Sequence, residues 1–148
     1  MAKSRVVVKD KGLSEILQRM KGASKLGITV GVHGDGEIAT YAAANEFGTD
    51  EIPERSFLRS TMDTRQTDIA NVITKTFERV SNGTLTPRQA GAVIGAWVQA
   101  AVRKTIQSNV PPPNAPATIA KKGSSHTLID EGRLRQGITF KVKDGASK

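Results

Sequence analysis

The sequence predicts an α+β fold in which a small antiparallel sheet packs against a long helical hairpin and short flanking helices. Two short segments, residues 27–33 and 137–142, alternate apolar and polar residues, which is typical of half-buried strands. Two longer segments, residues 61–80 and 86–106, carry apolar residues at the helical period instead, and only a short turn separates them. Together these segments predict one small sheet and one hairpin of helices.

A single domain accounts for the whole chain. The 148 residues are enough for one domain with its own core and too few for two domains of ordinary size. We expect this domain to span residues 1–148, with frayed ends at about 1–4 and 143–148. The apolar fraction of 37% is modest, so the core is expected to be thin.

The first predicted elements are short. The β-branched run at residues 5–8 is typical of an edge strand. Residues 13–20 carry apolar side chains at spacings of three and four, which predicts an amphipathic helix that ends before a stop at Gly22. The strand at residues 27–33 follows this helix.

A turn and an alanine-rich helix come next. Residues 34–36 (Gly-Asp-Gly) predict the turn, because glycine adopts positive φ and aspartate bonds to nearby backbone. Residues 37–47 predict a helix that stops at Gly48. Residues 51–57 are expected to be irregular, because Pro53 biases the residue before it towards an extended conformation.

The helical hairpin occupies the middle of the chain. One long helix is predicted from about Thr61 to Val80, with Ser-Asn-Gly as its stop. The second helix begins at Thr86, because Thr-Pro-Arg-Gln supplies an N-cap, a proline at the first helical position and a capping-box glutamine. Gly91 and Gly95 lie four residues apart in this helix. They either allow another backbone to approach closely or simply weaken the helix.

The C-terminal part begins with a proline-rich segment. Residues 111–116 (PPPNAP) hold four of the six prolines and are expected to be extended and stiff. A short helical turn over residues 117–121, a loop over residues 122–126 and a brief turn or helix over residues 130–136 should follow. The strand at residues 137–142 then completes the sheet.

The net charge of +8 is distributed unevenly. Residues 1–26 carry seven basic and two acidic groups, and residues 103–148 carry nine basic and three acidic groups. Residues 27–102 carry six basic and nine acidic groups, and residues 35–54 hold six acids and no Lys or Arg. Three interpretations stand: an ordinary solvated surface, attraction to phosphate through the long-range field, or head-to-tail pairing of copies into a ring.

Composition excludes several classes of function. Cysteine is absent, which excludes disulfides, thiolate metal sites and cysteine nucleophiles. The two histidines, His33 and His126, are not at metal-ligand spacing, and Ser124 lacks the glycines of a nucleophile elbow. We therefore expect no enzyme, no catalytic or metal-binding residue and no cofactor. No apolar run approaches the roughly 18 residues of a membrane span, so no membrane partner is expected.

Four basic residues around the loop at residues 122–126, which we call the late loop, are candidates for contact with DNA: Lys121, Lys122, Arg133 and Arg135. Aromatic residues make up only 4% of the chain, which argues against a platform on which bases stack. No helix-turn-helix or zinc motif accompanies the basic residues. The contact we expect here is therefore nonspecific and made to phosphate.

Two stretches, residues 41–63 and 113–142, carry several short motifs in a fixed order. These motifs are NEFGT at 45–49, IPERSFL at 52–58, NAP at 114–116, Thr118 with Lys122, and LIDEGRL at 128–134. With a helical hairpin between them, the two stretches resemble the small tail-completion or neck proteins of tailed bacteriophages, the head–tail joining family of lambda-like and related phages. The resemblance covers residues 28–142. Glu131 departs from it, because the family is expected to have a threonine or similar residue there.

The resemblance implies a structural virion protein without catalysis, made in the host bacterial cytoplasm and located at the head–tail junction. The chain would join its own copies in a ring, a hexamer, around the DNA channel. Its neighbours would be the tail terminator and the head-completion protein, and the four basic residues named above would face DNA in the channel.

The same resemblance implies an interface with a neighbouring subunit or partner, made by residues of the first stretch: Phe47, Ile52, Pro53, Arg55, Phe57, Leu58 and Arg59. The two phenylalanines anchor this segment either in the core or against a neighbour. The two arginines pair either within the subunit or across an interface. Residues 121–126 are expected to be mobile until partners bind.

Two alternative functions remain open. The chain could be a tail terminator or a head-completion (stopper) protein of the same virion, because small ring-forming proteins reuse similar architectures. It could also be a basic, nonspecific DNA-binding protein, which would bind free DNA with a steep dependence on salt.

Overall fold

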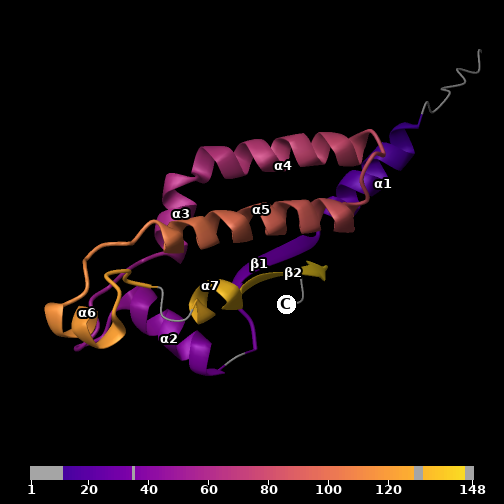
Figure 1. Ribbon diagram of the computed structural model, residues 1–148. Coiled ribbons are helices and arrows are strands. Elements are labelled where there is room, and N and C mark those ends of the chain that lie inside the picture. The colour runs from indigo at the N-terminus through magenta and orange to yellow at the C-terminus, as the bar shows by residue number, and fades with distance from the viewer. Residues whose placement is uncertain (1–11, 35, 129–131, 146–148) are drawn as a thin grey trace, which may run out of the picture.

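The computed structural model describes residues 12–34, 36–128 and 132–145. A two-stranded antiparallel sheet, formed by β1 (Leu26–Val32) and β2 (Ile138–Asp144), packs against the long helix α5 (Pro87–Gln107). Helix α4 (Gln66–Ser81) lies along the opposite side of α5 (Figure 1). The predicted α+β class, a small antiparallel sheet packed with a helical hairpin, is confirmed.

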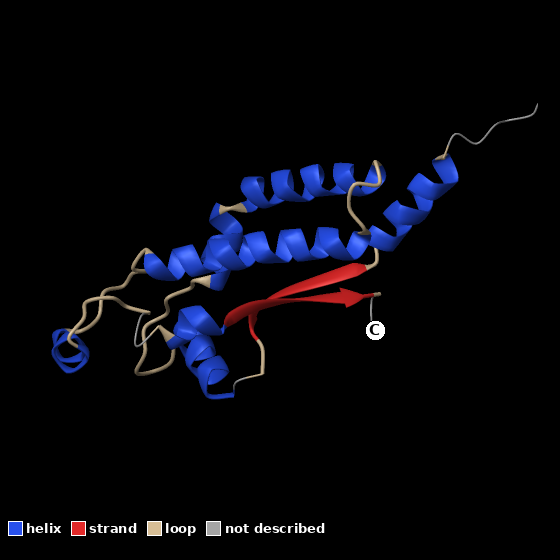
Figure 2. Cartoon of the chain, turned by 45° about the vertical axis from the view of Figure 1, so that its right-hand side comes forward, coloured by secondary structure: helices blue, strands red, loops and turns tan. Residues whose placement is uncertain are grey.

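Short helices flank this centre. Helix α1 (Leu13–Ala23) packs at the end where α4 and α5 are joined, and α3 (Leu58–Thr64) lies at the other end of α4. Helices α2 (Gly36–Phe47) and α7 (Arg133–Gly137) contact one another beside the sheet. Helix α6 (Pro116–Lys122) stands apart from them on long connecting segments, as both Figure 1 and Figure 2 show.

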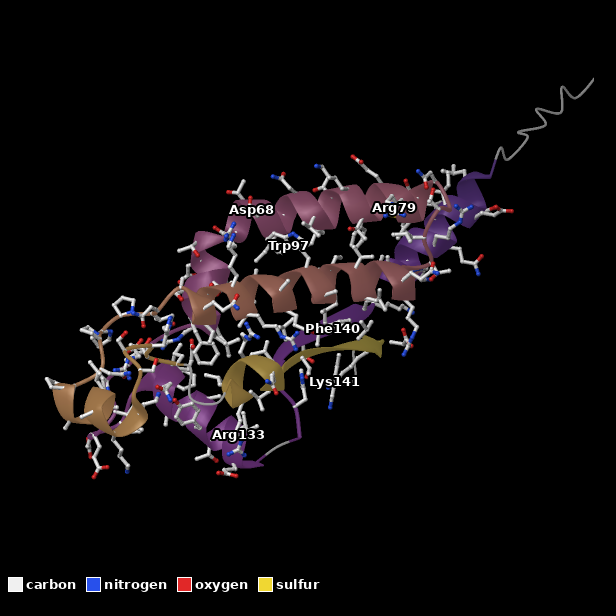
Figure 3. All side chains as sticks on the ribbon, viewed as in Figure 1. Asp68, Arg79, Trp97, Arg133, Phe140 and Lys141 are labelled. Carbon is white, nitrogen blue, oxygen red and sulfur yellow. The ribbon has the colours of Figure 1, made fainter. Side chains whose placement is uncertain are left out.

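The sheet has one apolar face and one polar face. The register places Val30 opposite Phe140, and the ring of Phe140 lies between β2 and α5 (Figure 3). The neighbouring pair, Thr29 and Lys141, faces the other way, and Lys141 points away from α5. Within the described residues each strand has one unpaired edge.

The two glycines of α5 lie where the sheet approaches the helix most closely. A Cβ atom on Gly91 would lie 2.8 Å from Cγ1 of Val142, and one on Gly95 would lie 2.8 Å from Cγ of Phe140. The close-approach interpretation therefore holds, but the neighbours are strand side chains rather than another backbone. Because α5 has no side chain at these positions, β2 can pack directly on it.

The second helix of the hairpin begins as its sequence predicts. The Thr86 hydroxyl accepts from the Gln89 backbone N–H at 3.3 Å, and the Gln89 side-chain oxygen accepts from the Thr86 backbone N–H at 2.9 Å. This reciprocal pair is the predicted capping box, with Pro87 in the first turn. Helix α5 then runs 21 residues and supplies the largest share of the core.

Two predicted helix boundaries are wrong. The helix predicted from Thr61 to Val80 is two helices, because the backbone at Arg65 turns to φ −107° and ψ 13° and separates α3 from α4. Helix α1 passes through Gly22 and ends at Ala23. Gly22 is needed for packing, since a Cβ there would lie 3.3 Å from Cγ of Pro87 at the start of α5.

The other described elements follow the sequence closely. The predicted strand at residues 5–8, the middle of the turn at residue 35 and the start of the turn or helix at residues 130–136 lie outside the described residues. The ends at 1–4 and 146–148 do too. Fraying from residue 143 is wrong, because β2 continues through Lys143 and Asp144, which pair with Gly27 and Leu26.

The core lies between α5 and the sheet and continues into the loops at one end. Val102 and Ile106 of α5 are fully buried, as is Ile138 at the start of β2. Phe57 and Leu128, from the two stretches that carry the sequence motifs, are buried in the same cluster. The loop end of the molecule is therefore part of the hydrophobic core.

Candidate functional site

The carboxylate of Glu46 lies buried at the end of α2, next to the N-terminus of α3. Its Oε2 atom accepts from the backbone N–H groups of Phe57 and Leu58, each at 2.8 Å. Its Oε1 atom accepts from the backbone N–H of Arg59 at 2.9 Å and from the Ser56 hydroxyl at 3.0 Å. These bonds satisfy the N–H groups that a helix leaves unpaired at its N-terminus, so Glu46 acts as the cap of α3.

The environment of Glu46 keeps it ionised. Burial raises the pKa of a carboxyl, but the backbone N–H groups of Arg59 and Leu58, with the side chains of Arg59 and Ser56, outweigh burial and lower the pKa of Glu46. The guanidinium of Arg59 donates from Nε to Glu46 at 3.0 Å and stacks 4.9 Å from the ring centre of Phe47. Its pKa is raised, chiefly by the bond to Glu46.

Arg55 is the second centre of this site, and its buried side chain has no carboxylate partner among the described residues. Its Nε donates to the carbonyl oxygen of Pro112 at 2.8 Å, and its NH2 donates to that of Pro113 at 3.3 Å and to Asn114 Oδ1 at 3.2 Å. Its backbone N–H donates to the carbonyl of Asn45 at 2.6 Å. Arg55 thus joins the end of α2 to the proline-rich segment.

Asparagines continue the network into the late loop. The Asn114 amide donates to the carbonyl of His126 at 3.0 Å. Asn109, which adopts a positive φ of 62°, accepts from the backbone N–H of Thr127 at 2.9 Å. The Thr127 hydroxyl donates to the carbonyl of Val110 at 2.8 Å. We call the network from Glu46 through Arg55 and Asn114 to Thr127 the polar junction.

A cleft of about 530 Å³ opens beside the polar junction. Its walls come from the end of α2, the segment before α3, the proline-rich segment and the start of α6. Tyr41, Ile52 and Pro53 line one side, and Pro113 and Lys122 line the other. The cleft therefore lies between the two stretches that carry the sequence motifs.

The seven candidate interface residues divide into surface and interior. Phe47 is 66% exposed, Pro53 is exposed, Ile52 is partly exposed, and the Arg59 side chain keeps half of its surface. Phe57 has no exposed surface, and Arg55 has 6%. Leu58 is half-buried and packs on the core. Of the alternatives posed by the sequence, Phe57 anchors the core, and Arg55 and Arg59 form bonds within the subunit.

The four candidate DNA-contacting residues do not form one cluster. Lys121 and Lys122 lie on α6, away from α7. Arg133 on α7 forms an ion pair with Glu37 at 3.2 Å. Arg135, also on α7, lines a different cleft, shared with α5.

The acids of residues 35–54 are also less available for contacts with other chains than their number indicates. Glu46 is buried in the polar junction, Glu37 pairs with Arg133, and Glu54 pairs with Arg59 at 2.8 Å. These three acids are compensated within the subunit. A head-to-tail contact between copies would have to use the remaining acids of this stretch.

Glu46 and Asn114 organise the polar junction, but no local sequence pattern marks them for this role. Glu46 is one of six acids in its stretch, and its partners lie 10 to 13 positions further along the chain, which a local pattern does not reveal. The available signal was a single acid directly before the apolar Phe47 at the end of a helix. For Asn114, the signal was an Asn between prolines, where a side chain replaces missing backbone donors.

None of the helices in the described part of the chain combines the length and apolar character that a membrane span requires. Across the same described residues, no three His, Asp or Glu side chains converge as metal ligands would. No protein-family model, curated protein or solved structure matches this chain.

Proposed function

We propose that the chain is a structural subunit of a tailed-bacteriophage virion, which forms a ring at the head–tail junction and joins the tail to the head around the DNA channel. The observation that carries the proposal is the polar junction. Through Arg55 and Asn114 it connects the two distant stretches whose motifs resemble the head–tail joining family.

The contact between the stretches gives the resemblance a physical reason. Arg55 belongs to IPERSFL and Asn114 to NAP, and one bonds directly to the other. Glu46 of NEFGT caps the helix that begins at Leu58 of IPERSFL. Residues that jointly build one junction are expected to occur together in a family, whereas a chance resemblance in two stretches has no reason to place them in contact.

Surface features of the subunit suit a ring. The two-stranded sheet has an unpaired edge on each described strand, and an unpaired edge can pair with a strand of another chain. Phe47 on α2 and Leu17 on α1 are 66% and 59% exposed. Neighbouring copies would cover such edges and side chains, and six copies closed by rotation would leave none of the contacts open.

A tail terminator or head-completion protein of the same virion is the alternative assignment. Its ring architecture would be of the same kind, and fold alone does not separate these roles. Electron microscopy would separate the head-completion role, because loss of a protein that closes the head is expected to leave heads without DNA, whereas loss of a neck protein is expected to leave filled heads.

The test is electron microscopy of a lysate from the encoding phage or prophage with this gene disabled. The proposal predicts filled heads and separate tails that do not join, with joining restored by a plasmid copy of the gene. Complete, infectious particles from the disabled phage would overturn the proposal. The +8 net charge would then favour a nonspecific DNA-binding protein.

A further inference from the structure

A cleft of about 390 Å³ lies between the C-terminal half of α5 and the short helix α7. Among the described residues its lining contains three cations and no carboxylate: Ala100, Arg103, Lys104, Gln107, Arg135 and Gln136. The clefts beside the polar junction and beside α3 each contain a glutamate, whereas a cleft on α6 is lined by Lys121 and Lys122 with two uncharged residues. We call the cleft between α5 and α7 the basic cleft.

Arg103 is fixed in the wall of the basic cleft by neutral acceptors. Its NH2 donates to the carbonyl of Ile138 at 2.8 Å, where β2 begins, and more weakly to that of Gln136 at 3.4 Å. The Gln99 amide, with its oxygen turned to the guanidinium, accepts from both terminal nitrogens at 3.0 and 3.1 Å. The Nε of Arg103 is buried without a partner in the described structure. The guanidinium is positioned, and none of the described acids forms an ion pair with it.

Lys104 and Arg135 add two further cations to the basic cleft. Five arginines elsewhere in the described chain form ion pairs: Arg19, Arg59, Arg65, Arg88 and Arg133. Among the described residues, neither Lys104 nor Arg135 has such a pair. Lys104 and Arg135 lie in the last turns of α5 and α7, where the helix carbonyls offer each of them only partial negative charge. The three cations line one cleft, so their positive potentials add there.

We propose that the basic cleft binds the phosphodiester backbone of double-stranded DNA. Lys104 and Arg135 donate to phosphate oxygens, and Arg103 supplies fixed positive charge behind them. The amides of Gln107 and Gln136 lie in the same lining and add donors. No aromatic side chain lines the cleft, so the contact reads phosphates rather than bases.

This inference deepens the proposed function and rests on it for the presence of DNA beside the subunit. It also moves the expected DNA contact. Of the four basic residues singled out in the sequence, only Arg135 remains in the contact, joined by Arg103 and Lys104 from the hairpin. In a ring, the basic clefts of successive subunits would follow the charged backbone of DNA passing through the channel.

The test measures binding of the purified full chain to a fluorescent 20-base-pair duplex across a range of salt concentrations. The cleft variant is Lys104→Gln with Arg135→Gln, and Arg103 stays because it holds the start of β2. The control variant is Lys121→Gln with Lys122→Gln on α6, which removes the same two charges from another surface. Circular dichroism checks that both variants fold.

Each phosphate contact contributes about 0.9 to the slope of log affinity against log salt. The cleft variant is therefore expected to have a slope lower by about 1.8, and the control variant is expected to keep the slope of the original chain. Equal losses in both variants would overturn the proposal, because net charge alone would then explain binding. Undetectable binding of the original chain at about 50 mM salt would overturn it too.

Inorganic phosphate provides a second arm. If it shifts the amide resonances of the basic cleft at constant ionic strength while the duplex does not bind, the cleft is a free-anion site and the DNA proposal fails. The duplex titration does not depend on particle assembly. A cleft variant that binds as the original chain does, beside a disabled phage whose heads and tails stay separate, would overturn this inference and leave the proposed function standing.

Discussion

Arg55 and Asn114 are 59 positions apart in the chain, and the guanidinium of Arg55 donates to Asn114 Oδ1 at 3.2 Å. The two side chains come from the two stretches that flank the helical hairpin. Because these stretches lie on either side of the hairpin in the chain, their contact forms only when the whole domain is folded. The predictions below test the residues that hold the junction and the hairpin.

Substitution Glu46→Gln is expected to lower the free energy of unfolding by about 2–3 kcal/mol, because an amide offers one acceptor atom where the carboxylate offers two and leaves buried donors unpaired. Urea unfolding measures the change. Glu54→Gln is the matched control: Glu54 bonds to the same Arg59 but is half exposed, and its loss should cost less than about 1 kcal/mol. Equal effects of both substitutions would contradict the capping role of Glu46.

The lowered pKa of Glu46 predicts a dependence of stability on pH. Because the pKa is lower in the folded chain than in the unfolded chain, ionised Glu46 stabilises the fold above the ordinary glutamate range, near pH 4.3. This contribution is lost as the pH falls through the folded pKa. Between pH 7 and about pH 3, the urea midpoint should therefore fall less in Glu46→Gln than in the original chain. Parallel losses in the two proteins would show that Glu46 is not responsible.

Substitution Arg55→Met is expected to loosen the late loop. It removes the donors to Pro112, Pro113 and Asn114, and unpaired buried acceptors cost about 2 kcal/mol. Trypsin should then cleave after Lys121 and Lys122 faster than in the original chain.

The control for this experiment is Arg65→Met, which removes an exposed pair with Asp68 on α4 and should leave cleavage unchanged. The original chain also tests the expectation that residues 121–126 are mobile before partners bind. Full protection of this segment in the isolated subunit would contradict that expectation, and unchanged cleavage in Arg55→Met would show that Arg55 does not hold the loop.

Substitution Gly95→Ala is expected to destabilise the chain by a net of about 1–2 kcal/mol. The added Cβ would lie 2.8 Å from Cγ of Phe140, and overpacking of this kind exceeds the gain of nearly 1 kcal/mol in helix propensity. Adding Phe140→Leu should cost less in Gly95→Ala than in the original chain, because the smaller side chain relieves the clash.

Gly36→Ala, at the start of α2, is the control for the glycine experiment. A Cβ there meets nothing within 4 Å, so the change in the free energy of unfolding should stay within about 0.5 kcal/mol. If Gly95→Ala proves as neutral as Gly36→Ala, then the sheet does not pack on α5 as closely as described.

The parts of the fold that the sequence predicts are those fixed by neighbouring residues. Thr86, Pro87 and Gln89 contain the whole signal for the start of α5, and the capping box forms as expected. The strands follow from their alternation over six or seven residues. Such signals need no knowledge of the rest of the chain.

The parts that the sequence does not predict depend on distant partners. The break at Arg65 interrupts a helical pattern that has no local stop, and the start of α3 before it is set by Glu46, which lies 12 positions before Leu58. Gly22 resembles a helix stop but provides space for Pro87. The basic cleft lies between α5 and α7. No local sequence pattern reveals it, because Arg103 and Arg135 are far apart in the chain.

The central claim is that this chain occupies the head–tail junction of a virion. Immunogold labelling of intact particles of the encoding phage, with an antibody to the purified chain, tests that claim most directly. The account predicts gold at the junction between head and tail, absent from particles whose gene for this chain is disabled. Gold along the tail, over the head or absent from intact particles would contradict it.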